Sequence, residues 1–122
     1  GCKDGACDDD LMILAKSHLP APLFDAAHLA RYTGGDTALK AELLDLMCTQ
    51  ARRCIALMAT APDRESWIAA THTLKGAARG VGAFALGDAC EAVETLDAAD
   101  WPAGTEAVEQ AFLATQSCFA TC

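Results

Sequence analysis

The sequence predicts an all-α protein: an up-and-down antiparallel four-helix bundle with additional short N-terminal helices. Apolar residues recur at three- and four-residue intervals through most of the chain, which is the spacing of one helix face. No segment shows the alternation of apolar and polar residues that is typical of a strand. The connections between the periodic segments are short, and short connections favour antiparallel neighbours in a bundle.

Two short helices are expected ahead of the bundle. The first covers about residues 9–17 and is stopped by the two prolines that follow it. The second begins after Asp25, whose carboxylate can cap it. Phe24 and Leu29 have the spacing of a hydrophobic staple around this cap. The Gly34–Gly35 pair is expected to end the second helix.

Four longer helices are expected to build the bundle. Asp36 and Asp63 can cap the first two, while Gly80 and Gly82 break the second. The expected ranges are about 37–60, 63–80, 84–98 and 102–122. The expected inward residues outside the second helix are Leu39, Leu43, Leu46, Met47, Cys54 and Met58, then Leu86, Ala89, Cys90, Val93 and Leu96, then Val108, Phe112, Thr115, Phe119 and Cys122.

The second bundle helix carries two different stripes when its residues are placed at intervals of about 100°. The inward stripe consists of Trp67, Thr71, Leu74, Ala78 and Val81. The outward stripe consists of Ile68, His72, Lys75, Gly76 and Arg79. A histidine therefore faces outward among two cations and a glycine.

The outward stripe has the chemistry of a phosphoryl-accepting site. An exposed imidazole nitrogen of His72 is a nucleophile, and Lys75 and Arg79 offer positive charge to phosphate oxygens. Gly76 costs about 0.5–1 kcal/mol in a helix relative to Ala, which is best explained by close approach of a large partner. Ile68 and Arg79 are then docking residues. Each of these residues alone is also typical of a solvated helix face.

The segment from His72 to Gly82 resembles the signature of the histidine-containing phosphotransfer (HPt) domain family. In that family a histidine is followed by Leu, Lys and Gly at the second, third and fourth positions, and an aliphatic-Gly pair comes further on. This chain supplies His72, Leu74, Lys75, Gly76, Val81 and Gly82. The similarity covers roughly residues 22–120.

The resemblance implies a role for each matching residue. His72 is the phosphorylated residue, Lys75 is the cation that faces the phosphate, and Gly76 gives clearance to a receiver domain. Glu94 stands where the family commonly places a Glu or Gln against the imidazole, and a hydrogen bond from Nδ1–H to it would leave Nε2 free. Gly80 departs from the family, which more often has a better helix former there.

The resulting hypothesis is a histidine phosphotransfer protein of a two-component phosphorelay. Nε2 of His72 attacks the phosphoaspartate of a receiver domain, and a second receiver takes the group in the reverse step. The expected partners are receiver domains of response regulators or hybrid histidine kinases. Because the chain has no nucleotide-binding loop motif and no acidic metal cluster, Mg²⁺ and most catalytic groups are expected on the receiver. The protein is thus expected to be a phosphocarrier without a cofactor, not an enzyme.

Three other functions remain open. The chain could be the phosphoaccepting helix pair of a sensor histidine kinase, although Thr73 and not an acid follows the histidine. It could also be the phosphoacceptor domain of a chemotaxis-type kinase, which shares the site and differs in the source of phosphate. Lastly, it could be a helical interaction module whose histidine is never phosphorylated.

Charge is unevenly distributed along the chain. The net charge is −8, and the segment from Gly80 to Cys122 contains seven acids and no base. This argues against nucleic acid as a partner, because its phosphates require clustered cations. Lys75 and Arg79 are expected to form a local positive spot, joined by Arg52 and Arg53, that attracts the acidic pocket of a receiver.

The seven cysteines include no Cys-x-x-Cys pair, and most occupy apolar helix positions, where a free thiol acts as a small hydrophobe. A reducing cytoplasm is therefore the expected location. A metal shared by Cys118 and Cys122 is a weaker alternative, because no second pair has ligand spacing. The chain also shows neither a secretory signal nor an apolar run of about 18 residues, so no membrane association is expected.

Length and pattern favour a single domain. Residues 1–10 are expected to be an acidic, flexible N-terminal segment, and residues 11–122 a single HPt-like helical bundle. The apolar seams of the four longer helices are expected to be complete within one chain. A monomer is therefore expected.

Overall fold

The computed structural model describes residues 23–119 and contains no strand in this range, so the all-α prediction is confirmed. The helix expected at residues 9–17 lies outside the described part, as do the last residues of the final helix. The described elements are α2 (Ala26–Thr33), α3 (Thr37–Ala59), α4 (Arg64–Gly80), α5 (Phe84–Glu94), the 3-10 helix η1 (Ala98–Asp100) and α6 (Trp101–Phe119).

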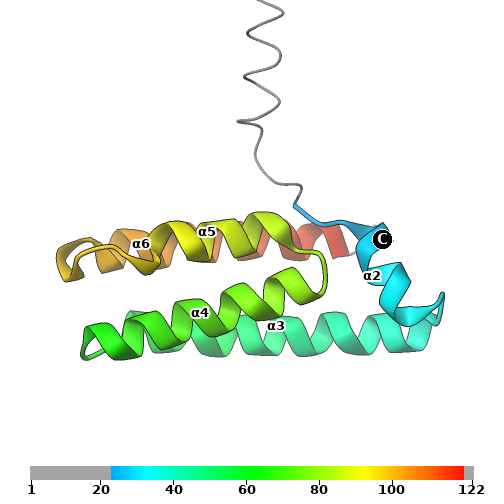
Figure 1. Ribbon diagram of the computed structural model, residues 1–122, viewed down its shortest axis with the longest axis horizontal. Coiled ribbons are helices and arrows are strands. Elements are labelled where there is room, and N and C mark those ends of the chain that lie inside the picture. Colours follow the sequence, from blue (N-terminus) through cyan, green and yellow to red (C-terminus); the bar gives the residue numbers. More distant parts are fainter. Residues whose placement is uncertain (1–22, 120–122) are drawn as a thin grey trace, which may run out of the picture.

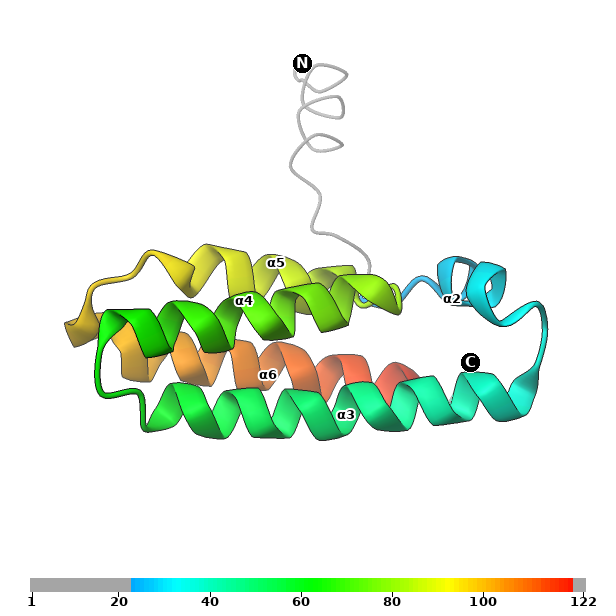
Figure 2. The ribbon, with the colours of Figure 1, turned by 60° about the horizontal axis from the view of Figure 1, so that its bottom comes forward.

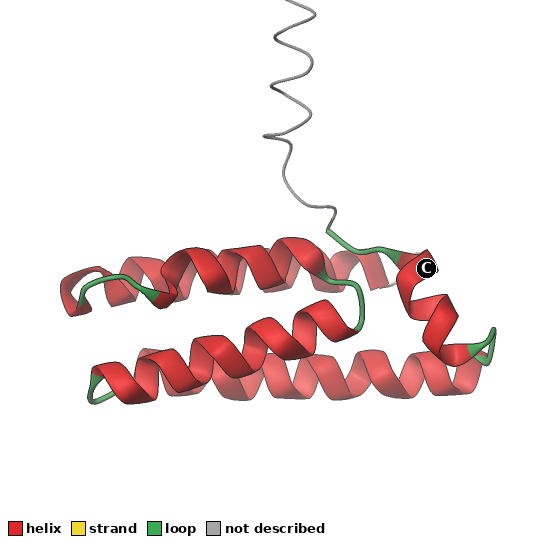
Figure 3. Cartoon of the chain, viewed as in Figure 1, coloured by secondary structure: helices red, strands yellow, loops and turns green. Residues whose placement is uncertain are grey.

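Helices α3 to α6 form a four-helix bundle (Figure 1). Packing contacts join α3 to α4, α4 to α5, α5 to α6 and α6 back to α3, so the four helices enclose a common core. Consecutive helices run in opposite directions, and α2 lies at one end of the bundle beside the start of α3 (Figures 1 and 2). Short loops join the helices (Figure 3), as an up-and-down arrangement requires.

The three aspartates expected to cap helices all do so. Asp25, Asp36 and Asp63 each accept a hydrogen bond from the backbone N–H three residues later, at 2.8–3.0 Å. These bonds satisfy N–H groups that have no partner inside the first helical turn. Gly34 ends α2 in the left-handed conformation with φ of 60°, as the sequence predicted.

Gly82 determines how α2 meets the end of α4. Its φ of +92° lies in the left-handed region, which glycine adopts without steric cost. The carbonyl oxygen of Gly82 accepts a hydrogen bond of 2.8 Å from the backbone N–H of Asp25. A Cβ at this position would lie 2.7 Å from the carbonyl oxygen of Asp25, so only glycine allows this approach.

The core is centred on the inward stripe of α4. Trp67, Thr71, Leu74 and Ala78 are fully buried, which confirms the predicted orientation of the helix. The ring of Trp67 stacks on that of Trp101 with centroids 4.9 Å apart. Because these residues lock α4 against its neighbours, the opposite face of the helix is held in a fixed position towards solvent.

The end of α5 differs from the prediction. The helix stops at Glu94, one turn earlier than expected, and η1 follows after a short connection. The indole N–H of Trp67 donates to the carbonyl oxygen of Val93, and that of Trp101 donates to the carbonyl oxygen of Leu96, both at 3.0 Å. The two indole N–H groups therefore bind carbonyl oxygens that would accept backbone hydrogen bonds if α5 were longer.

Two leucines expected in the core of α3 are on the surface. Leu39 is 37% exposed and Leu46 is 58% exposed, and Leu57 is also half exposed. They lie on a second apolar stripe of α3. Its residues also have the spacing of one helix face, but the bundle does not cover them. The buried residues of α3 are Leu44, Met47, Cys48, Ala51, Cys54 and Met58.

Three cysteines of the described part, Cys48, Cys54 and Cys90, are free thiols. Cys48, Cys54 and Cys90 are buried, and Cys118 is partly buried. Cys122, the second residue of the suggested metal pair, lies outside the described range. Within residues 23–119, no three His, Cys, Asp or Glu side chains are grouped so that they could hold a metal ion.

We expect alkaline pH to destabilise the protein through Cys90. Burial raises the pKa of its thiol from 9.0 to about 12. As pH rises above 9.0, the unfolded thiol loses a proton that the folded one keeps until about 12, so the free energy of unfolding falls across this range. Urea midpoints measured under reducing conditions across this range should therefore decline. Cys90→Ala should reduce the decline, and an equal slope in that variant would exclude Cys90 as the cause.

Candidate functional site

His72 lies in the middle of α4 on its outer face. Its side chain is exposed, whereas Thr71 and Leu74 beside it in the sequence are fully buried. Within residues 23–119 the imidazole has no hydrogen-bond or ion-pair partner. The structure therefore presents an unengaged imidazole on a helix that the core holds rigidly.

Lys75 and Glu94 form an ion pair that joins α4 to α5 one turn after the histidine. The distance from Nζ to Oε1 is 3.0 Å, and the two side chains are only 17% and 20% exposed. The resemblance placed Glu94 against the imidazole of His72, but the structure places its carboxylate on Lys75. In this ion pair the attraction between two full charges adds to the hydrogen bond.

Arg79 is held by two carboxylates of α5. Its guanidinium donates to Asp88 and Glu91, and this hydrogen bonding lowers the pKa of the Glu91 carboxyl. Gly87 makes the arrangement possible, since a Cβ there would lie 2.7 Å from Cγ of Arg79. The aliphatic part of the Arg79 side chain therefore passes over α5 at Gly87.

The expected positive spot is largely neutralised. Lys75 and Arg79 both pair with carboxylates of α5, and Arg52 lies on the opposite side of α3, with its guanidinium 5.7 Å from the ring centroid of Phe112. Arg53 lies between α3 and α4. The four cations expected in one spot are therefore separated: Lys75 and Arg79 point to α5, Arg52 points to α6, and Arg53 lies in the groove between α3 and α4.

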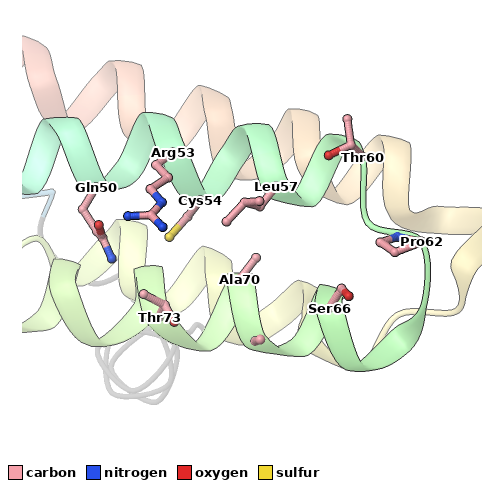
Figure 4. A pocket seen from close by; sticks show the side chains of 10 residues that line it. Gln50, Arg53, Cys54, Leu57, Thr60, Pro62, Ser66, Ala70 and Thr73 are labelled. Atoms are coloured by element: carbon pink, nitrogen blue, oxygen red, sulfur yellow. The ribbon is translucent and has the colours of Figure 1, made fainter.

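A groove lies between α3 and α4. It has a volume of about 430 Å³, and its walls include Arg53, Cys54 and Leu57 of α3 and Thr73 of α4 (Figure 4). Since Thr73 directly follows His72, the groove borders the outer face of α4. The sequence analysis did not predict this groove. The second apolar stripe of α3, to which Leu57 belongs, was a signal for it.

The outer face of α4 near the histidine is open. Gly76 is exposed, and a Cβ there would meet no atom within 4 Å. Ile68, one turn before His72, is 37% exposed. Packing inside the bundle therefore does not explain why Gly76 is a glycine, and an apolar residue, a histidine and a glycine share one accessible surface.

We expect Glu94→Ala to leave the tautomer populations of His72 unchanged, because the carboxylate contacts Lys75 and not the imidazole. The same substitution should lower the free energy of unfolding by about 1.5–3 kcal/mol, the usual range for a hydrogen bond to a charged group. Nitrogen NMR of the imidazole and urea unfolding measure the two effects. A shift in the tautomer ratio would show that Glu94 acts on His72 directly.

No helix in residues 23–119 combines the length and apolarity needed to cross a bilayer.

Comparison with known protein families finds a match over residues 42–118, which extend from the first part of α3 to the end of α6 and include the histidine. The matching family model is described as Hpt domain. No curated protein and no solved structure matches the chain.

Proposed function

We propose, from the premise that this chain belongs to the Hpt domain family of two-component signalling, that it carries a phosphoryl group on His72 between receiver domains. The supporting observation is the exposed imidazole on the outer face of α4, with Lys75 and Gly76 within about one turn of it. The other described histidine, His28, is unsuited, because its Nε2 is buried and its ring packs against Tyr32 and Phe84.

The proposed reaction is an in-line transfer that needs little chemistry from this chain. Nε2 of His72 attacks the phosphorus of a receiver phosphoaspartate, the bond from phosphorus to the aspartyl oxygen breaks, and the carboxylate leaves. The ammonium of Lys75 stabilises charge on the phosphoryl oxygens, and Glu94 holds that ammonium beside α4. The receiver supplies Mg²⁺ and the remaining catalytic groups, so this chain acts as a carrier.

The partners proposed are receiver domains of response regulators or hybrid histidine kinases. One chain supplies all four helices of the bundle, which supports a monomeric carrier over the dimerising helix pair of a sensor kinase. A chemotaxis-type phosphoacceptor domain would share this site and take its phosphate directly from a kinase.

Labelled ATP, a hybrid kinase and its receiver provide the test. The chain should acquire label only when the phosphorylated receiver is present, and the label should survive alkali and be lost in acid, as a phosphoramidate bond requires. Label that is stable in acid would exclude a phosphohistidine. Label acquired from a kinase without any receiver would favour the chemotaxis-type alternative.

A further inference from the structure

Arg53 differs from the other cations around His72. Lys75 and Arg79 are both paired with carboxylates of α5, whereas Arg53 has no ion-pair partner within the part of the chain that the structure describes. The side chain of Arg53 points from α3 into the groove between α3 and α4 (Figure 4). The cation without an ion pair therefore lies on the α3 side of α4, in the groove that Thr73 also lines.

Besides Arg53, the groove is lined by apolar residues and by uncharged polar residues, among them Gln50, Ser66 and Thr73. Leu57 is 50% exposed, and the buried Cys54 and Ala70 form part of the wall. Burial raises the pKa of the Cys54 thiol, so the thiol contributes a neutral surface. The groove thus combines apolar contacts with one unpaired guanidinium.

The α5 side of the histidine has the opposite character. Asp88 and Glu91 are 57% and 60% exposed, and α5 to α6 contain acids and no base. The one described cation that reaches these two carboxylates, Arg79, neutralises only part of their charge. The two flanks of the site therefore differ in sign, and a partner that covers His72 meets both.

We propose that Arg53 is a specificity-determining residue for the receiver. It forms an ion pair with a carboxylate on the docking face of the receiver, next to an apolar side chain that enters the α3–α4 groove. This inference rests on the proposed phosphotransfer function. The polarity of the two flanks fixes the orientation of the receiver, since a carboxylate placed over α5 would be repelled by Asp88 and Glu91.

The test compares Arg53→Glu with the wild-type chain in exchange with a phosphorylated receiver. We expect kcat/KM to fall about tenfold, mainly through KM, because a charge at the edge of an interface acts on association. The maximal rate at saturating receiver should stay within about twofold, since Arg53 does not touch the reacting atoms. The wild-type rate should also fall with ionic strength more steeply than that of the variant.

Arg52→Glu is the matched control. It makes the same charge change on the neighbouring residue of α3, but its side chain lies over Phe112 on the far side of the helix. We expect this variant to exchange within about twofold of wild type, whereas Arg53→Lys should restore most of the activity lost in Arg53→Glu. Exchange at the wild-type rate by Arg53→Glu, or an equal loss in Arg52→Glu, would overturn the proposal.

Two further measurements separate this inference from its alternatives. Labelling of His72 by phosphoramidate should be equal in wild type and Arg53→Glu, and a loss there would mean that Arg53 acts on the histidine itself. A wild-type dimer that Arg53→Glu dissociates in sedimentation would assign the groove to a second copy of the chain. If wild type is labelled by phosphoramidate but exchanges with no receiver, the proposed function fails, independently of Arg53.

Discussion

His72→Gln is expected to abolish phosphoryl acceptance while leaving the bundle intact. The amide of glutamine has no nucleophilic nitrogen, so the bond to phosphorus cannot form. The side chain at this position is exposed and has no partner within the described residues, so the free energy of unfolding should change by no more than about 0.5 kcal/mol. Label from a phosphorylated receiver measures the first effect, and urea unfolding measures the second.

His28→Gln provides the comparison for this result. His28 packs against aromatic rings in the junction between α2 and α5, and its replacement should leave label on the chain. His18→Gln, at the third histidine, should also retain label. Label that persists in His72→Gln would contradict the assignment of His72 and would direct attention to the other two histidines.

Features that depend on a few neighbouring residues could be predicted from the sequence. An N-cap needs only a carboxylate and the N–H three residues later, and all three expected aspartate caps are present. The two stripes of α4 follow from helix geometry alone, because Trp67 and its apolar companions can face only one side. The outward orientation of His72 could be predicted for the same reason.

Features that depend on a choice between distant partners could not be predicted. The sequence offers Glu94 either the imidazole of His72 or the ammonium of Lys75 as a partner, and the placement of α5 against α4 brings it to Lys75. Arg79 is captured by α5 because Gly87 leaves space for its stem. The early end of α5 likewise depends on the indole of Trp101, whose N–H finds a carbonyl five residues earlier.

The second apolar stripe of α3 shows a different limit. Leu39 and Leu46 have the spacing of core residues, but a helix with apolar residues on two faces does not reveal from its sequence which face the bundle covers. Leu57, which lies on the same stripe and is also exposed, lines the groove at Arg53. Apolar spacing therefore identified the helix correctly and assigned part of its surface wrongly.

Gly76→Gln is expected to stabilise the protein and to impair exchange with receivers. Glutamine is the better helix former by about 0.5–1 kcal/mol, and a Cβ at this position meets no atom within 4 Å, so the folded bundle accepts the side chain. The same side chain stands one turn from His72 on the surface that the receiver must cover. Because a displacement of about 1 Å can cost about a hundredfold in rate, a large loss in receiver exchange is expected.

Gly80→Gln distinguishes clearance from a general effect of helix stability. Gly80 is also a glycine of α4 with open space at its Cβ position, but it lies one turn further from His72. Gly80→Gln should gain stability and lose less exchange than Gly76→Gln. Phosphoramidate is too small to need the docking surface, so it should label His72 at similar rates in both variants and in wild type. If Gly76→Gln exchanges phosphate with receivers at the wild-type rate, a side chain at this position does not obstruct the receiver, and the clearance argument is refuted.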